Sequence, residues 1–398
     1  MKLTIIIVSY NVRYYLQQCL DSIEKAVQYI DAEVCVIDNH SKDDTVAYIR
    51  QHYPYVKVIA SMHNNGFAKA NNIAIRQTDS EYVLLLNPDT VVGENALKEC
   101  VDFMDSHIDA GGVGVKMLRI DGSSALESRR GLPTPMTSFY KMSGLCEKFP
   151  NSHRFGKYYM GYLPWNKVGQ IEVISGAFMM LRRTALNKSG LLDEDFFMYG
   201  EDIDLSYRLL KNGYTNWYVP AKILHYKGES TQKSSFKYVH VFYEAMLIFF
   251  KKHYGHLSVW LNLPIKTAIY VKASIALVGM MSANVKKAMG LSSFKKQTTP
   301  DYLFIGRPEM ISYCRQLAAK NGLAARYVVG DSVSLPGGHL HLKNEINATK
   351  QTYIVYHVGS YSYEQLLDIF DRQPQANILM GFYHDKENII ITDREIIG

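Results

Sequence analysis

The sequence of 398 residues predicts an α/β fold whose first half forms an open, doubly wound parallel sheet with helices on both faces. Two observations support this prediction. Short runs of consecutive apolar residues, typical of strands buried on both faces, alternate with longer segments in which apolar residues recur at helical spacing. Each run is also followed by polar residues, as expected for a sheet that binds a ligand at the carboxyl ends of its strands.

The expected elements follow one another in strand–helix order. The predicted strands of the first half are 3–9, 34–37, 56–60 and 82–86, separated by helices over 12–29, from about Ser41 and from about Gly66. Strand–helix pairs in an unbroken row favour parallel strands joined by crossover helices. Residues 111–170 are less regular, and we expect a loop-rich insertion that covers a substrate. Strand character returns at 171–181 and 217–224, and a loop followed by a helix is expected over 193–213.

The chain length exceeds one compact core, and three parts are expected. Residues 1–237 form the nucleotide-binding domain, and residues 238–290 form an apolar helical connector. Within it, segment 239–281 is apolar but contains Lys266 and Lys272, which disfavours a spanning helix. Either an interfacial helix pair in peripheral contact with a membrane or a hairpin packed on the first domain fits this pattern. Residues 300–398 are predicted to form a small α/β domain without a known phosphate-binding motif.

Composition limits the class of protein. The apolar fraction of 47% and the charged fraction of 21% are ordinary for a folded chain. A net charge of +6 suits a phosphate-rich ligand or an anionic membrane surface and establishes neither, and we expect no nucleic-acid partner. The five cysteines lack zinc-site spacing, and the N-terminus has no signal-peptide pattern. We therefore expect a cytoplasmic protein, with peripheral attachment to the inner face of the membrane as an option.

Two polar groups that directly follow predicted strands are candidates for binding a nucleotide and a metal. Asp89, in the sequence Asn87-Pro88-Asp89, can reach a divalent ion that bridges two phosphates, although a Pro-Asp turn is a common structural feature. Asp38 can accept hydrogen bonds from a base or ribose, and the alternative is a helix-capping turn. His225 ends a later strand and is able to complete the metal site, but a lone histidine is more often structural.

Two further clusters point to phosphate binding and to acid–base chemistry. Gly66 permits a tight turn at a helix start, where ribose or phosphate oxygens can bind, and Asn65 and Asn71 flank this turn. The segment 199–204 holds three carboxylates, of which Glu201 and Asp202 are the candidates for a general base near an acceptor hydroxyl. A helix N-terminus that favours acidic residues explains the cluster only in part.

Taken in order, these motifs resemble glycosyltransferase family 2, most of all its rhamnosyltransferase-like bacterial branch. The matching segments are 8–11, 37–39 with Ser41 and Asp43, 65–68 with Asn71 and Asn72, 87–89, 175–177, 200–204, and His225 with Gly228 and Ser230. The resemblance covers about residues 3–255. It implies a GT-A fold, with a parallel or mixed sheet, and inverting transfer of a sugar from a nucleoside-diphosphate sugar in one displacement.

The resemblance also implies roles for individual residues. The implied nucleotide-binding residues are Ser9, Tyr10, Asn11, Asp38, Asn39, Asn65, Gly66, Asn71 and Asn87. Asp89 and His225 are implied as ligands of Mg²⁺ or Mn²⁺, Asp202 as the general base, and Glu201 as the residue that orients it or the acceptor. The family's metal motif is often Asp-x-Asp, and here Asn87 takes its first position. Acceptor contacts are expected from Arg129, Arg130 and Gly176.

The substrates stay open at this point. The subgroup suggests dTDP-rhamnose as donor, with UDP-sugars as the alternative, and a saccharide or lipid-linked saccharide as acceptor. A non-catalytic protein that senses nucleotide sugars or glycans is the main competing hypothesis, and the acidic cluster at 201–204 argues against it. A nucleotidyltransferase on a similar fold is a third hypothesis, which predicts release of pyrophosphate.

Overall fold

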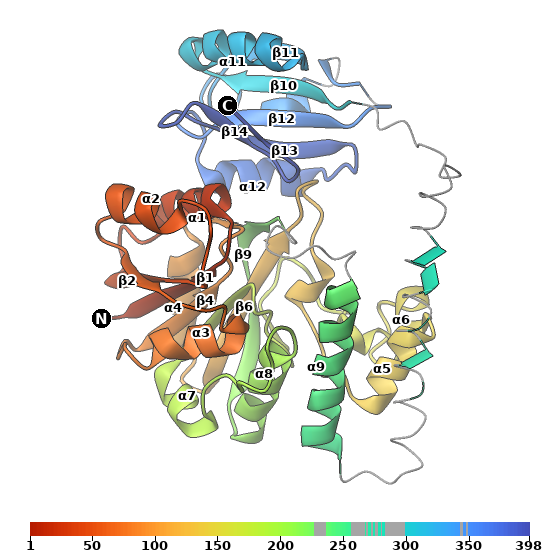
Figure 1. The fold of residues 1–398 in the computed structure, drawn as a ribbon. Coiled ribbons are helices and arrows are strands. Elements are labelled where there is room, and N and C mark those ends of the chain that lie inside the picture. The colour runs from red at the N-terminus through yellow and green to blue at the C-terminus, as the bar shows by residue number, and fades with distance from the viewer. Residues whose placement is uncertain are drawn as a thin grey trace.

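The computed structural model describes residues 1–226, 236–255, 299–342, 345–347 and 349–398, together with residues 267, 270, 271, 274, 278, 279, 281 and 282. Within these ranges the chain forms two β-sheets with helices packed on them, one from the N-terminal part and one from the C-terminal part (Figure 1). The predicted α/β fold class is confirmed.

The first sheet has a parallel half and a mixed half. Its strands are β1 (Leu3–Ser9), β2 (Ala32–Asp38), β3 (Lys57–Ala60), β4 (Tyr82–Leu86), β5 (Thr90–Val92), β6 (Ala110–Leu118), β7 (Gly169–Ile171), β8 (Phe178–Arg182) and β9 (Thr215–His225). They lie in the order β3-β2-β1-β4-β8-β6-β9-β5, and β7 pairs with β9. β1 to β4 are parallel, while β8 is antiparallel to both β4 and β6. The strand order reverses next to β1, where open sheets of this kind bind ligands.

Helices cover both faces of this sheet. They are α1 (Arg13–Ala26), α2 (Thr45–His52), α3 (Gly66–Ile75), α4 (Ala96–Ser106), α5 (Pro135–Met142), α6 (Leu145–Lys148), α7 (Arg183–Ser189), α8 (Glu201–Lys211) and α9 (Phe236–Tyr254). α1, α2 and α4 contribute to the core on one face, and α3, α7 and α8 to the core on the other. Along β1, Ile5 and Ile7 join the first core and Ile6 joins the second, so the strand is apolar throughout because both of its faces are buried.

The predicted loop-rich insertion begins too early in the sequence. Residues 110–118 are not a loop but the buried strand β6, in the middle of the mixed half. Its glycines concealed it, because glycine is depleted in strands. A Cβ at Gly112 would lie 2.6 Å from Cδ1 of Ile174, so the absence of a side chain there permits close packing. The remaining part of the predicted insertion contains α5 and α6.

The apolar segment after residue 237 is used in part for packing on the first domain. α9 places Ala245 and Phe249 against Phe196, and His253 Nε2 lies 2.6 Å from Oδ1 of Asp204. Phe249 and Phe250 of α9 are buried, so these two aromatic side chains of the segment 239–281 are not available for the predicted peripheral contact with a membrane. Most of residues 256–298, and also Gly228 and Ser230, lie outside the described residues. No helix among those that are described has both the length and the apolar character needed to cross a membrane.

The second sheet belongs to the C-terminal part. It consists of β10 (Asp301–Gly306), β11 (Ala324–Val329), β12 (Thr352–His357), β13 (Ile378–His384), β14 (Ile389–Ile391) and β15 (Ile396–Ile397), with helices α11 (Pro308–Asn321) and α12 (Tyr363–Arg372). The order is β11-β10-β12-β13-β14-β15, and the first four strands are parallel. α11 packs on one face and α12 on the other. The sequence predicts strands and helices for this part of the chain but neither β13 nor β15.

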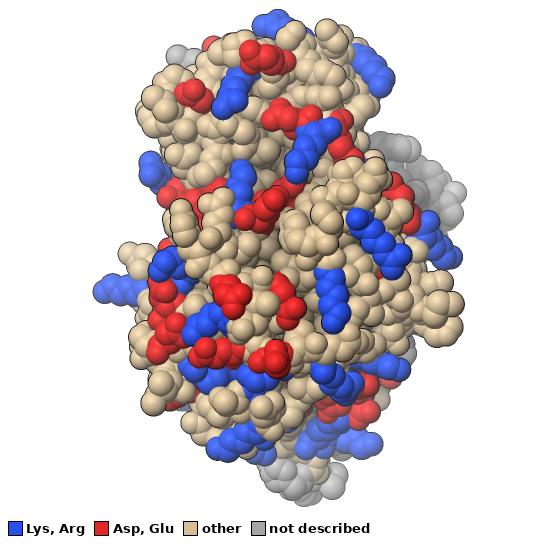
Figure 2. All heavy atoms as spheres, turned by 90° about the vertical axis from the view of Figure 1, so that its left-hand side faces the viewer, with Lys and Arg blue, Asp and Glu red and all other residues tan. Residues whose placement is uncertain are grey.

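Helix α12 joins the two parts of the molecule. Leu366 and Phe370 of α12 share one apolar cluster with Val91 of β5 and Leu224 of β9. Lys222 of β9 pairs with Asp368 at 2.5 Å in the same interface. Acidic and basic side chains lie interspersed over the face shown in Figure 2, without a large area of a single sign. The C-terminal part is thus anchored against the strand pair β5–β9.

Candidate active site

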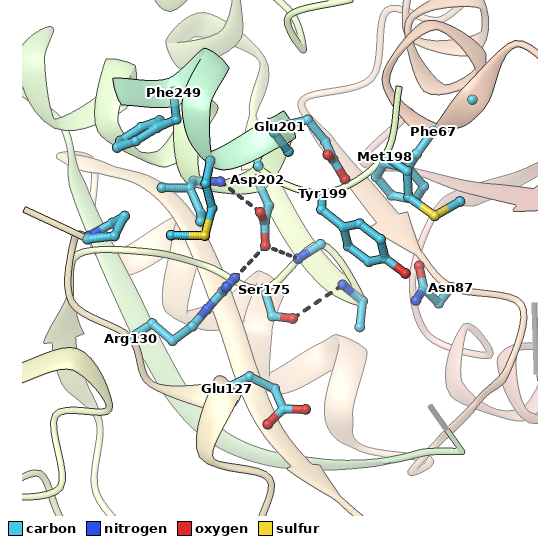
Figure 3. A pocket seen from close by; sticks show the side chains of 18 of the residues that line it. Phe67, Asn87, Glu127, Arg130, Ser175, Met198, Tyr199, Glu201, Asp202 and Phe249 are labelled. Carbon is cyan, nitrogen blue, oxygen red and sulfur yellow. Dashed lines mark hydrogen bonds and ion pairs between the residues drawn. The ribbon is translucent and has the colours of Figure 1, made fainter. Parts of the chain in front are cut away.

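A cavity of about 610 Å³ lies at the carboxyl ends of the strands of the first sheet. Predicted site residues that line it are Tyr10, Asn39, Gly66, Asn87, Asp89, Arg130, Gly176, Glu201, Asp202 and His225. They come from segments far apart in the sequence, because the ends of β1, β2, β4 and β9 and the start of α8 meet at this edge. Figure 3 shows Asp202 near the middle, with Asn87 on one side and Phe249 on the other.

Asp202 is held in the cavity wall by three donors. Its Oδ2 accepts hydrogen bonds from the backbone N–H of Gly176 at 3.2 Å and from the Arg130 guanidinium, with which it forms an ion pair. Its Oδ1 accepts from the N–H of Ile203 at 2.8 Å. The side chain is 14% exposed, so it is fixed in orientation but reachable from the cavity. A carboxylate in this position is able to accept a proton from a ligand hydroxyl.

Glu201 is the first residue of α8 and lies beside Asp202. It is 6% exposed, and its Oε2 has no hydrogen-bond partner among the described residues. Burial raises the pKa of Glu201 to about 8, and the neighbouring charge of Asp202 acts in the same direction. The two adjacent carboxyl groups therefore differ in environment: Asp202 is paired with a cation, and Glu201 is buried in a setting that favours its neutral form.

Asp89 and His225 meet at the β5–β9 strand pair. Asp89 immediately precedes β5, His225 ends β9, and Thr90 is directly opposite His225 in the ladder. Oδ1 of Asp89 lies 3.3 Å from Nε2 of His225, and Nδ2 of Asn87 lies 3.3 Å from the same nitrogen. The pairing of the start of β5 with the end of β9 thus brings the Asp89 carboxylate and the His225 imidazole together on the cavity wall.

These two side chains suit a divalent cation as a pair. Adjacent corners of an octahedron with bonds of about 2.1 Å are about 3.0 Å apart, close to the separation of the Asp89 oxygen and the His225 nitrogen. No group of three or more His, Cys, Asp or Glu side chains in the described part of the chain is arranged to hold a metal. A cation held here would therefore take its remaining ligands from a bound phosphate or from water, as Mg²⁺ usually does.

The turn before α3 forms another part of the wall. Asn39 holds this turn from both sides: its Oδ1 accepts from the N–H of Asn65 at 3.1 Å, and its Nδ2 donates to the carbonyl of Gly66 at 2.9 Å. Gly66 has φ +73°, and a Cβ there would lie 2.4 Å from the carbonyl oxygen of Phe197. Only glycine fits this position, and its backbone supports Phe67, whose ring lines the cavity.

Several predicted site residues do not line the cavity, and most of them support it from behind. They are Ser9, Asn11, Asp38, Asn65, Asn71 and Arg129. Asp38 is buried directly behind Asn39, where its Oδ2 accepts from the N–H of Ser41 at 2.9 Å; its Oδ1 has no hydrogen-bond partner among the described residues. Asn71 is buried in α3 and donates to the carbonyl of Phe67. The helix-capping alternative for Asp38 is wrong, because α2 begins at Thr45 with Asp44 as its N-cap, and Oδ2 of Asp38 instead closes a turn onto Ser41.

The expectation that Arg129 contacts an acceptor is wrong. Its side chain is 2% exposed and stacks on Trp165, with Cζ 3.4 Å from the ring centroid. Neighbouring residues in extended backbone point in opposite directions, so Arg130 faces the cavity while Arg129 faces the interior. The two arginines looked equivalent in the sequence because a loop gives no periodic signal that distinguishes inside from outside.

Other cavity residues carried no recognisable signal in the sequence. Ser138 and Lys141 come from α5, and Met246, Phe249 and Phe250 come from α9. The spacing of Phe249 and Phe250 in an apolar run was interpreted as part of a connector, since the run alone does not reveal the surface on which it packs. Tyr199 lies between Asp202 and Asn87 in Figure 3 and directly precedes the acidic cluster.

Comparison with known proteins adds the family. Residues 4–190 match the family model described as glycosyl transferase family 2. This domain belongs to that family. The chain is a glycosyltransferase, and the resemblance inferred from the motifs is confirmed.

Two curated relatives are rhamnosyltransferases. The chain is 27% identical over 288 residues to N-acetylglucosaminyl-diphospho-decaprenol L-rhamnosyltransferase from Mycobacterium tuberculosis. This alignment covers 69% of this chain and 91% of the relative. The chain is 27% identical over 235 residues to rhamnosyltransferase WbbL from Escherichia coli K12, covering 56% and 82%. Among solved structures, the mannosyltransferase of Pyrobaculum calidifontis in complex with GDP-Man and Mn²⁺ matches with a TM-score of 0.44 and 17% identity, covering 74% of this chain and 81% of its own.

Proposed function

We propose that this glycosyltransferase transfers rhamnose from a nucleoside-diphosphate donor, dTDP-linked or UDP-linked, to a saccharide carried on a lipid diphosphate. The single observation that carries the catalytic part is the position of Asp202 in the cavity wall between the Asn87 side and the Phe249 side. The rhamnosyl donor and the lipid-linked acceptor are suggested by the names of the two curated relatives.

The proposed mechanism is a single displacement with inversion. The acceptor hydroxyl donates its proton to Asp202 while its oxygen attacks the anomeric carbon of the donor sugar. The bond from that carbon to the phosphate oxygen breaks, and the nucleoside diphosphate leaves with the electron pair. Arg130 and the Gly176 N–H orient Asp202 and stabilise its charge before the transfer. Glu201 is buried beside Asp202, and while Glu201 is protonated the site carries one negative charge fewer.

Asp89 and His225 would hold Mg²⁺ or Mn²⁺, and such an ion would offset the charge that develops on the departing diphosphate. The amide of Asn87 contacts the same Nε2 of His225, so this contact would be replaced when the imidazole holds the ion. Tyr10, Asn39 and Gly66 bind the nucleotide at the adjacent edge, and the unsatisfied Oδ1 of Asp38 makes this carboxylate the candidate that accepts a hydrogen bond from the base.

The test is a donor screen with the purified full-length chain. Release of nucleoside diphosphate is measured with dTDP-rhamnose, UDP-sugars and GDP-sugars, each with and without N-acetylglucosamine linked through diphosphate to a short isoprenoid alcohol. We expect acceptor-dependent release with dTDP- or UDP-rhamnose. Binding of a nucleotide sugar without any turnover would favour the sensor hypothesis, and release of pyrophosphate from a nucleoside triphosphate would favour a nucleotidyltransferase.

A further inference from the structure

The α5 wall of the cavity presents a hydroxyl without a hydrogen-bond partner and an ammonium without an ion-pair partner among the described residues. Ser138 and Lys141 are three residues apart on α5, so their side chains lie on the same face of the helix, and both line the cavity. Ser138 is 6% exposed, and its Oγ has no hydrogen-bond partner among the described residues. Lys141 donates to the hydroxyl of Tyr159 and lies over the ring of Tyr158, 3.8 Å from its centroid.

Lys141 forms no ion pair within 4.0 Å with any carboxylate in the described ranges. Glu127 and Glu147 line the same cavity, but neither is within that distance of its ammonium. Burial lowers the pKa of Lys141 to about 8 and the neighbouring charge of Arg130 also lowers it, while the carboxylates of Glu147 and Glu127 act more weakly in the opposite direction. Two cations therefore share one end of the cavity, and only Arg130 has an anionic partner, Asp202. An anion bound beside Lys141 would remove this repulsion and restore the charge balance.

Next to this polar pair the cavity wall is apolar. Met142 of α5 and Met246, Phe249 and Phe250 of α9 line it, and Phe249 lies on the side of Asp202 away from Asn87 (Figure 3). The donor diphosphate is assigned to the opposite side, near Asp89 and His225. The α5–α9 side thus offers what a phosphorylated lipid requires: a hydrogen-bond donor, a cation and a flexible apolar surface beyond them.

We propose that Ser138 and Lys141 bind the phosphate that links the acceptor sugar to its lipid, and that the apolar wall of Met142, Met246 and Phe249 binds the first part of the lipid chain. This proposal rests on the proposed transfer to a lipid-linked saccharide. It assigns the acceptor to the α5–α9 side of Asp202 and the donor to the Asn87 side. Asp202 then lies between the two substrates, where its oxygen reaches the acceptor hydroxyl.

Two acceptors separate this subsite from the rest of the site. The first is N-acetylglucosamine joined through diphosphate to a short isoprenoid alcohol, and the second is the methyl glycoside of N-acetylglucosamine. We expect Lys141→Met to lower kcat/KM for the first acceptor relative to the second on the order of ten- to a hundredfold, through a higher KM, since a charged hydrogen bond is lost. Lys141→Arg should restore most of this preference, and Ser138→Ala should reduce it by a smaller factor.

The matched control is Lys148→Met on α6, because Lys148 is exposed and does not line the cavity. We expect it to leave the preference at the wild-type value. The lipid wall is tested with a third acceptor, N-acetylglucosamine diphosphate without the isoprenoid chain. Met246→Gln, which keeps the side-chain volume but adds a polar group, should weaken the preference for the isoprenoid acceptor over this third acceptor.

An unchanged preference in Lys141→Met would overturn the phosphate subsite, and an unchanged preference in Met246→Gln would overturn the lipid wall. Failure of the proposed function would look different: the wild-type protein itself would transfer no sugar to either acceptor. A preference that falls equally in Lys141→Met and Lys148→Met would indicate general attraction of anions by surface charge and would also contradict the assignment.

Discussion

The two sheets of this protein share a topology but differ at the edge where ligands bind. Each has a parallel part in which the strand order reverses, β3-β2-β1-β4 in the first and β11-β10-β12-β13 in the second. Each also has polar residues after the strands at that edge. By topology alone, both edges are expected to bind a ligand. The two edges differ in how far the hydrogen-bonding capacity of their buried polar groups is satisfied.

At the second edge the polar side chains that follow β12 satisfy one another, although Nε2 of His384, at the end of β13, has no hydrogen-bond partner among the described residues. Nδ1 of His357 lies 2.6 Å from Oγ of Ser360, and its Nε2 lies 2.6 Å from Oδ2 of Asp385. Arg307 donates to the carbonyl of Gly359 across the same edge. These contacts tie the loops that follow β10 and β12 to one another, beside a second cavity of about 510 Å³ that Gly359 and Ser360 help to line.

At the first edge polar groups are buried without partners. Oε2 of Glu201, Oγ of Ser138 and Oδ1 of Asp38 each lack a hydrogen bond within the described residues. Buried polar groups of this kind reduce stability and are retained where a ligand uses them. The comparison teaches that strand order indicates where a site can form, while several unsatisfied polar groups gathered around one cavity, as at the first edge, indicate which of two similar edges has become one.

The largest effect that would test this contrast is expected for Asp202→Asn. Asparagine still accepts hydrogen bonds from Arg130 and Gly176 but accepts no proton from the acceptor, so transfer should fall by about 10³-fold. Nucleotide affinity, measured by calorimetry, should change little, because the nucleotide is assigned to the Asn87 side. Transfer within tenfold of the wild type would remove Asp202 from the role of general base.

The next effect concerns the metal. Treatment with EDTA should reduce transfer on the order of a hundredfold, and added Mg²⁺ or Mn²⁺ should restore it, because the carboxylate of Asp89 supplies no positive charge of its own to offset that of a leaving diphosphate. Asp89→Asn should raise the concentration of metal needed for half-maximal activity. Activity that is indifferent to chelator would contradict the role given to Asp89.

The sequence was most informative where both faces of a strand are buried. The run 82–86 was predicted with the bounds that β4 has, since five consecutive apolar residues between polar ones leave little freedom. The motifs at strand ends also identified part of the cavity wall, because the carboxyl ends of parallel strands must meet at one edge. Ten of the predicted site residues line the cavity, among them Asp89, Asp202 and His225.

The sequence was least informative where packing decides. β6 escaped prediction because close contacts with Ile174 require glycine in place of the usual β-branched residues. Arg129 and Arg130 differ only in the direction that each side chain takes, which a loop sequence does not encode. The α5–α9 wall was missed for a related reason: Lys141 and Phe249 meet only after two distant segments fold against the same cavity.

A smaller effect is expected in the pH dependence of stability. The pKa of Glu201 is raised from 4.5 to about 8 by burial, so the folded protein binds more protons than the unfolded chain between these values. Stability should therefore fall as pH rises through this window. Glu201→Gln should raise Tm by roughly 2–4 °C at pH 8 relative to the wild type and have little effect near pH 4. Glu147→Gln, at an exposed carboxylate of the same cavity, is the control and should not change the slope.

The smallest effect is expected at the second edge, where Ser360→Ala removes the hydroxyl that contacts His357. Losing this buried hydrogen bond should cost about 1 kcal/mol of stability, measured by chemical denaturation. The transfer rate per folded molecule should stay at the wild-type value, because Ser360 lies outside the cavity of the first sheet. Ser334→Ala, in an exposed turn, should cost less. A transfer rate that drops severalfold in folded Ser360→Ala would show that the second edge also takes part in the reaction, and the distinction between the two sheets would fail.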